Sequence, residues 1–189
     1  MCLASVLLFG VAPIANAGFF DPPSKAQVTK QQDAILDANQ KILKKLYKAE
    51  PNSKKLIDSS FGYATFSDFG MKIFVAGGGT GKGVVISKSP PSKTFMNMAE
   101  VQAGLGIGIK SFQVVFVFDN EKALRSFVNE GWSFGGQATA AAKYGKNGAA
   151  YQGALSVADG VWMYQLTDKG LAAEITLKGT KYYKNSELN

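Results

Sequence analysis

The stretch from Val101 to Phe118 constrains the fold of this chain more than any other, because its side chains alternate with a period of two. In its first half, residues 103–109, the odd positions are apolar and the even positions are all glycine; in its second half, residues 112–118, both faces are apolar. Such alternation is typical of β-strands, and a strand that is apolar on both faces is covered on both sides. We therefore predict a central hairpin with one arm of bare backbone. Two interpretations of the glycine arm are open: a β core without a ligand, or a groove that holds a lipid or another small molecule.

The distribution of glycine divides the chain into a helical arm, residues 18–60, and a β body, residues 61–189. Of the 21 glycines, 19 lie from Gly62 to Gly179. The predicted strands are 62–66, 71–77, 83–87, 95–109, 112–119, 134–142, 149–157, 161–166 and 172–178. Residues 120–129 are predicted to form a helix between the fifth and sixth strands. The fold class is α+β: an N-terminal amphipathic helix plus a glycine-rich antiparallel β-barrel or strongly curved sheet with one further helix.

The helical arm is predicted to hold a basic amphipathic helix from Ser24 to Glu50 and a short second helix from Asn52 to Ser59. On the first helix, apolar side chains occupy one wide arc and lysines cluster opposite. The lysines are Lys41, Lys44, Lys45 and Lys48, and the second helix adds Lys54 and Lys55. Two uses of the first helix are open: its apolar arc packs on the sheet with the lysines in water, or the lysines face anionic headgroups. Both hold together, because the two faces are separate.

The first residues resemble a secretory signal peptide. An uncharged apolar run from Leu3 to Ile14 precedes Ala15-Asn16-Ala17, an A-x-A cleavage site, although no Lys or Arg precedes Lys25. We therefore expect residues 1–17 to be removed and the protein to be exported, periplasmic or peripheral on the cell envelope. The cysteine, Cys2, would leave with the signal peptide, so no disulfide is expected. After cleavage the chain would begin with a short apolar tip that contains Phe19 and Phe20, which are candidates for membrane insertion.

The net charge favours an anionic surface as the partner. The formal charge is +7, and the basic side chains are 20 lysines and one arginine, Arg125. Proteins that read nucleic acids depend on arginine for bidentate contacts, so this balance predicts diffuse attraction to a membrane and no nucleic-acid partner.

The sequence offers no catalytic constellation. Residues 131–135, Gly-Trp-Ser-Phe-Gly, match the letters of a hydrolase nucleophile elbow, but the elements expected around them stand in the reverse order. The chain has no histidine, so a Ser-His-Asp triad is impossible. Neither zinc nor calcium ligands occur with a recognisable spacing. We predict a protein that is not an enzyme and that has no cofactor and no metal.

Residues 76–83, Ala-Gly-Gly-Gly-Thr-Gly-Lys-Gly, resemble a phosphate loop without its first glycine and without the Ser or Thr after the lysine. Two interpretations are open. The segment is either a turn between two strands or a nest of backbone N–H groups that, with Lys82, holds a lipid phosphate.

Several blocks together resemble the SYLF-domain lipid-binding family in its bacterial exported form. The blocks are FGYATF (61–66), AGGGTGKGVVI (76–86), QAGLGIGI (102–109), VVFVFDNEKALRSF (114–127), FGGQATAAA (134–142), GVWMYQL (160–166) and KGLAAEITLKGTKYY (169–183). The resemblance implies an antiparallel β body with accompanying helices, and binding to phospholipid membranes assisted by a basic amphipathic N-terminal helix, here Ser24 to Glu50. Many members carry Ala-Lys-Gly before the first strand, whereas this chain has Ser60-Phe61-Gly62. Any headgroup role of that lysine is therefore absent.

We therefore predict a non-enzymatic, exported domain that binds anionic phospholipid at a membrane surface. The candidate lipid-binding residues are Lys41, Lys44, Lys45, Lys48, Lys54, Lys55 and Lys82. The alternative is a structural or protein-interaction module of the cell envelope, with an envelope protein as its partner. A third hypothesis is a small apolar ligand inside the β body. The oligomeric state is left open.

Overall fold

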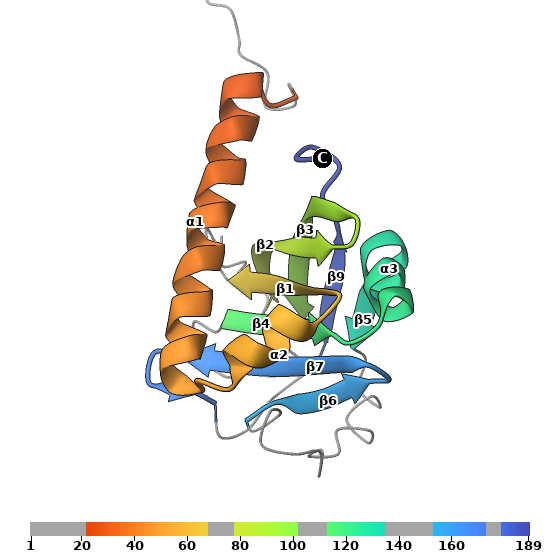
Figure 1. Ribbon diagram of the computed structural model, residues 1–189. Helices are drawn as coiled ribbons and strands as arrows, with labels where there is room; N and C mark the ends of the chain where they lie inside the picture. The colour runs from red at the N-terminus through yellow and green to blue at the C-terminus, as the bar shows by residue number, and fades with distance from the viewer. Residues whose placement is uncertain (1–21, 68–77, 102–112, 135–152, 173–178) are drawn as a thin grey trace, which may run out of the picture.

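The computed structural model describes residues 22–67, 78–101, 113–134, 153–172 and 179–189 (Figure 1). These residues form three helices, α1 (Lys25–Ala49), α2 (Ser53–Ser59) and α3 (Glu121–Glu130). The strands are β1 (Gly62–Ser67), β2 (Gly78–Lys88), β3 (Pro91–Val101), β4 (Gln113–Phe118), β5 (Trp132–Phe134), β6 (Leu155–Ala158), β7 (Val161–Thr167), β8 (Gly170–Leu171) and β9 (Thr180–Lys184). The predicted α+β class is confirmed.

All these strands join one antiparallel sheet. Its order is β5-β9-β3-β2-β1-β4-β7-β6, and β8 pairs with β7. The strand direction turns strongly across the sheet, from β6 and β7 at the bottom of Figure 1 to the nearly upright β9. Of the two alternatives that the sequence left open, the structure has the strongly curved sheet.

The sheet carries a core on each face, with α1 on one side and α3 on the other (Figure 1). Strand β4 shows why: Val114, Phe116 and Phe118 join the cluster that contains α3, whereas Val115 and Val117 join the cluster that contains α1 and α2. Because successive side chains of a strand point to opposite faces, an unbroken apolar run supplies both cores. The prediction that this strand is buried on both sides is confirmed.

Local signals set the helix ends. Ser24 caps α1 in a reciprocal capping box with Gln27, and Asn120 caps α3 by accepting a hydrogen bond from the Ala123 N–H at 2.8 Å. At the other end of α3, Gly131 takes a φ of +69°, which suits glycine. All three helices lie within about one residue of their predicted bounds.

The glycine-rich segment is neither the turn nor the nest that the sequence left open, as far as the structure describes it. Residues 78–83 are the first half of β2, paired with β3 along their length and with β1 at positions 82 and 83. A Cβ at Gly83 would lie 2.2 Å from the carbonyl oxygen of Thr65, and one at Gly81 would lie 2.4 Å from that of Ser67. The glycines therefore allow β1 to lie close against β2.

Strand β9 was not predicted, although it pairs with both β3 and β5. Several predicted strands lie wholly or partly outside the described residues: 71–77 and the glycine arm of the hairpin at 102–109 lie wholly outside, as do most of 134–142 and 172–178 and the first four residues of 149–157.

Candidate functional site: a lysine face on the first helix

Four lysines project from the C-terminal half of α1, and we call Lys41, Lys44, Lys45 and Lys48 the lysine face. Lys45 is half-buried and the other three are exposed. At about 100° per residue, the four positions fall within an arc of about 100° and within about 11 Å along the axis. No acidic residue occurs between residues 38 and 49. This half of the helix therefore presents four positive charges to solvent on one side.

The apolar arc of the same helix is covered by the sheet. Ile35, Ile42 and Leu46 are at most 4% exposed, and each belongs to a core cluster with residues of the sheet. Insertion of this arc into a bilayer would require α1 to leave the sheet. Of the two uses of the helix, packing on the sheet is the one the structure shows, and the lysines remain accessible in it.

Tyr47 lies at the junction of α1, α2 and β1, where its surroundings change the pKa of its phenol. Burial, with smaller contributions from Tyr63 and Asp58, raises the pKa of Tyr47 to about 12. The Tyr47 phenol therefore stays neutral even at an alkaline pH that ionises an exposed tyrosine, and it adds no negative charge beside the lysine face.

The second helix extends the basic surface only weakly. Lys54 and Lys55 are both exposed, but the Lys54 ammonium lies 2.6 Å from the Asp58 carboxylate. Both partners are more than half exposed, so the pair contributes little to stability. It does lower the net charge that α2 offers to an anion, which leaves Lys55 as its stronger candidate.

A lysine that sequence reasoning missed stands next to α2. Lys88, at the end of β2, donates a hydrogen bond from Nζ to the Ile57 carbonyl oxygen near the end of α2. Burial lowers the pKa of Lys88, Asp58 acts in the opposite direction, and Lys54 adds to the decrease. Its contact depends on the pairing of β2 with β1, so no local pattern in the sequence could have revealed it.

Lys82 does not join the other candidates. It lies on β2, half-buried, and its Nζ donates a hydrogen bond to Oε1 of Gln31 in the N-terminal half of α1. Gln31 precedes Lys44 by 13 residues, or about 20 Å of helix. The predicted nest of backbone N–H groups is also wrong at residues 78–83, because these residues form an extended strand, in which successive N–H groups point in opposite directions and do not converge on one anion.

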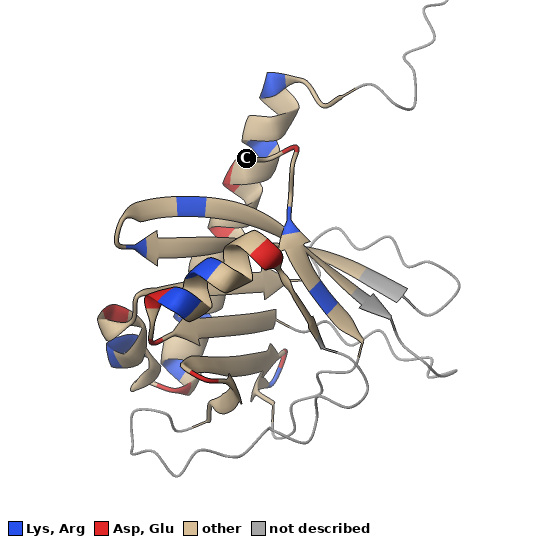
Figure 2. Cartoon of the chain, turned by 90° about the vertical axis from the view of Figure 1, so that its right-hand side faces the viewer, with Lys and Arg blue, Asp and Glu red and all other residues tan. Residues whose placement is uncertain are grey.

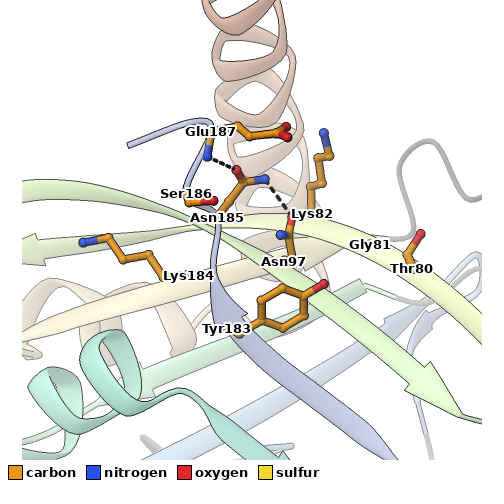
Figure 3. Close-up of a pocket in the computed structure, with 9 residues that line it drawn as sticks. All are labelled: Thr80, Gly81, Lys82, Asn97, Tyr183, Lys184, Asn185, Ser186 and Glu187. Carbon is orange, nitrogen blue, oxygen red and sulfur yellow. Dashed lines mark hydrogen bonds between the residues drawn. The ribbon is translucent and has the colours of Figure 1, made fainter. Parts of the chain in front are cut away.

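Instead, Lys82 lines a polar cavity of about 500 Å³ (Figure 3). The cavity lies between β2, β3, β9 and residues 185–187. Two further lysines lie on β9: Lys184 lines the cavity, and Lys181 Nζ lies 5.9 Å from the centroid of the Tyr183 ring.

Two predicted residues are left unplaced. Phe19 and Phe20 lie outside the described residues, as does the predicted signal peptide at 1–17. Within the described ranges, no group of three His, Cys, Asp or Glu side chains could hold a metal ion. None of the three described helices is long and apolar enough to cross a membrane.

Two comparisons with known proteins show what this chain is similar to. Residues 99–189 match the family Ysc84, described as "Las17-binding protein actin regulator". The chain is also 28% identical over 148 residues to "Beta cell expansion factor A" of Aeromonas veronii, an alignment that covers 76% of this chain. The chain spans about half, 53%, of the length of that relative. The ordered blocks of the β body, the curved antiparallel sheet and these matches agree, and together they support the predicted resemblance to the SYLF family, with the family match carried by residues 99–189.

Proposed function

We propose that this protein binds anionic phospholipid at a membrane surface without catalysing a reaction, and that the lysine face makes the contact. One observation carries the proposal: the lysine face is solvent-accessible while the apolar arc of the same helix is packed on the sheet. The resemblance to the SYLF family is compatible with this role. As an exported protein it would meet the bilayer at the cell envelope.

The contact would be peripheral and electrostatic. A lysine held near an anionic bilayer contributes about 1 kcal/mol at low salt, so the four positions together supply useful affinity without insertion of the helix. Lys55 would add to this attraction, and Lys54 would add less because Asp58 neutralises it. Phe19 and Phe20, which precede α1 in the chain, are the candidates for shallow insertion.

Co-sedimentation with vesicles tests the proposal. The protein is mixed with phosphatidylcholine vesicles that contain either no phosphatidylglycerol or about one third phosphatidylglycerol. A variant with Lys41, Lys44, Lys45 and Lys48 changed to glutamine serves as the test. We expect binding to the anionic vesicles only, and at least about a tenfold loss in this variant.

A charge-matched variant serves as the control. Basic residues occur on several other elements, including α3, the β2–β3 hairpin and β9 (Figure 2). Changing Lys25, Lys93, Lys122 and Lys169, all exposed, to glutamine also removes four charges and leaves a formal charge of +3. This control should lose clearly less affinity. Equal losses in the two variants would show that net charge, and not the lysine face, attracts the protein.

Salt gives a second check on the mechanism. At about 0.5 M salt the Debye length falls to roughly 4 Å, so exposed lysines and headgroups attract each other weakly. We expect most vesicle binding to disappear. Binding that persists unchanged would contradict an electrostatic contact.

A structural or protein-interaction module of the envelope is the second candidate. The packed apolar arc of α1 favours it, because the helix needs no bilayer to bury its apolar surface. The family description also names binding to a protein, Las17. Hydrogen exchange separates the two functions: anionic vesicles should slow exchange at residues 41–48 if the lysine face binds lipid, and should leave it unchanged if the surface serves a protein partner.

A further inference from the structure

The cavity beside Lys82 is built by one row of cross-strand neighbours. Lys82 on β2 is paired with Asn97 on β3, which is paired with Tyr183 on β9. The residues next to them, Met98 and Tyr182, are buried in the cluster under α3, so the row faces the other side of the sheet. Tyr183 remains 39% exposed, and Asn97 and Lys82 are half-buried. The row is thus accessible on the face that carries α1.

The chain after β9 forms a fixed wall of the cavity. Asn185 is only 5% exposed; its Nδ2 donates to Oδ1 of Asn97 at 2.8 Å, and its own Oδ1 accepts from the Glu187 N–H at 2.9 Å (Figure 3). Leu188 is buried with Ile35 of α1, and its carbonyl oxygen accepts a hydrogen bond from Gln32 at 2.9 Å. A wall held at both ends is preorganised for a ligand.

The charges at the cavity favour an anion. The Lys82 ammonium donates to the neutral amide of Gln31, and among the described residues it forms no ion pair. Lys184 also lines the cavity, whose acidic residue is Glu187. An ammonium has three N–H donors, so Lys82 keeps two for a ligand.

The neutral groups supply further donors. Hydroxyl groups of Thr80, Tyr183 and Ser186 line the cavity. Figure 3 shows Lys82 and Glu187 reaching to the same side, the Tyr183 hydroxyl directed toward the side of Thr80, and Lys184 extending away from them. The Lys82 ammonium can hold a phosphate, and the hydroxyl groups and the Glu187 carboxylate can hold alcohol groups, so the lining suits a ligand that carries both.

We propose that this cavity binds a small organic phosphate, with the phosphate on Lys82 and the hydroxyl groups of the ligand toward Glu187. A volume of about 500 Å³ lies within the range of small-molecule sites and exceeds what a bare phosphate would fill. The site is separate from the lysine face, so it goes beyond the proposed membrane contact. The phosphate comes either from a lipid headgroup or from a free metabolite.

Calorimetry with sn-glycerol 3-phosphate, with glycerol as the phosphate-free control, tests the proposal. We expect binding of glycerol phosphate and none of glycerol. Lys82→Gln should weaken binding at least about tenfold, because a hydrogen bond to a charged group contributes about 1.5–3 kcal/mol. Lys93→Gln removes the same charge from an exposed side chain that does not line the cavity, and should cost less than about threefold. No binding of glycerol phosphate, equal binding of glycerol, or equal losses in the two variants would overturn the site.

A measurement on the unaltered protein keeps the test independent of how the variants fold. In heteronuclear NMR spectra, glycerol phosphate should shift the amide signals of Asn97, Tyr183 and Asn185 and leave those of residues 41–48 in place. Shifts confined to the lysine face would contradict the proposal.

Vesicles then identify the source of the phosphate. If Lys82→Gln weakens binding to phosphatidylglycerol vesicles as well as to glycerol phosphate, the cavity takes a lipid headgroup. If vesicle binding is unchanged while glycerol phosphate binding is lost, the cavity takes a free organic phosphate. The lysine-face variant should retain glycerol phosphate binding in either case, so failure of the membrane proposal and failure of this one remain distinguishable.

Discussion

The two faces of the sheet are covered by helices of very different kinds. Helix α3 has 10 residues and buries Leu124 and Phe127 among aromatic rings. The centroid of the Phe127 ring lies 5.3 Å from that of Trp132 and 5.4 Å from that of Phe116. Helix α1 has 25 residues, yet its four buried positions include Asn39, which accepts a hydrogen bond from the Thr65 hydroxyl at 2.9 Å. The shorter helix has the denser apolar contact.

The difference in packing indicates that the two faces of the sheet have different roles. Aromatic rings that meet edge to face bury large areas and tolerate little rearrangement, so the α3 side serves stability. The α1 side combines apolar contacts with hydrogen bonds from polar side chains, among them Gln31, Gln32 and Asn39. The lysine face and the Lys82 cavity both lie on that side or along its edge. Four variants test this division of roles.

The largest effect is expected from Phe127→Ala. Removing a fully buried ring from the α3 side should lower the free energy of unfolding by about 3–5 kcal/mol, because lost burial and a residual cavity add together. Urea denaturation measures the loss, and Phe127→Leu should recover part of it. A loss below about 1 kcal/mol would mean that the aromatic cluster does not anchor the fold.

Truncating a buried side chain of α1 should lower the free energy of unfolding by less, and its effect should be confined more closely to the helix. Ile42 is 2% exposed, and Ile42→Ala should cost about 2–4 kcal/mol. Because α1 contacts the sheet through its own clusters, hydrogen exchange should accelerate most within residues 35–49. If β4 lost protection to the same extent, the two faces would be one cooperative unit and the comparison would fail.

Substitutions at Thr65 and Asn39, which share a buried hydrogen bond, should not have additive effects on stability. Thr65→Val keeps the shape of the side chain but leaves the Asn39 carbonyl oxygen without its donor, which should cost about 1–3 kcal/mol. In the double variant Asn39→Leu with Thr65→Val, both polar groups are gone, so the total loss should be smaller than the sum of the single losses. Additive losses in the double-mutant cycle would show that the hydrogen bond contributes nothing.

The smallest effect is expected from Tyr47→Phe and concerns alkaline pH. The unfolded chain releases the Tyr47 proton near pH 10, whereas the folded protein holds it to about 12. The folded state therefore binds more protons in this window, and its stability should fall as pH rises from about 10 toward 12. Tyr47→Phe should lose less stability over that range than the unaltered protein, as measured by thermal unfolding. Lys88 titrates in both proteins, so its contribution cancels in the comparison; identical pH profiles would contradict the assignment.

Much of the fold was predictable where the information is local. Ser24 and Pro51 bracket α1, Asn120 and Gly131 bracket α3, and the apolar run of β4 indicates burial on both faces. The glycine-rich start of β2 was missed, because four of the six residues 78–83 are glycine, a residue that disfavours strands, and only Thr80 and Lys82 carry side chains that could show a period. These residues form a strand because they pair with β3 and partly with β1, and those partners lie elsewhere in the chain.

The candidate site divides in the same way. The lysine face follows from helical spacing, and the structure exposes three of its four members. The separation of Lys82 from that face does not follow from spacing, since it depends on which part of α1 crosses β2. Lys88 was missed for the same reason, because its carbonyl partner lies 31 residues away on α2.

Composition and short-range periodicity are enough to predict an amphipathic basic helix, a glycine-rich β body and the absence of histidine chemistry. They do not reveal that the apolar arc of α1 is covered by the sheet, or that one cavity is lined by Lys82, Asn97, Tyr183 and Asn185. Asn97 and Asn185 are 88 residues apart, and they meet only because β3 and β9 pair in one register. A shift of that register by one residue would turn each side chain of β9 to the other face of the sheet, so the cavity belongs to the strand pairing and not to any single stretch of the chain.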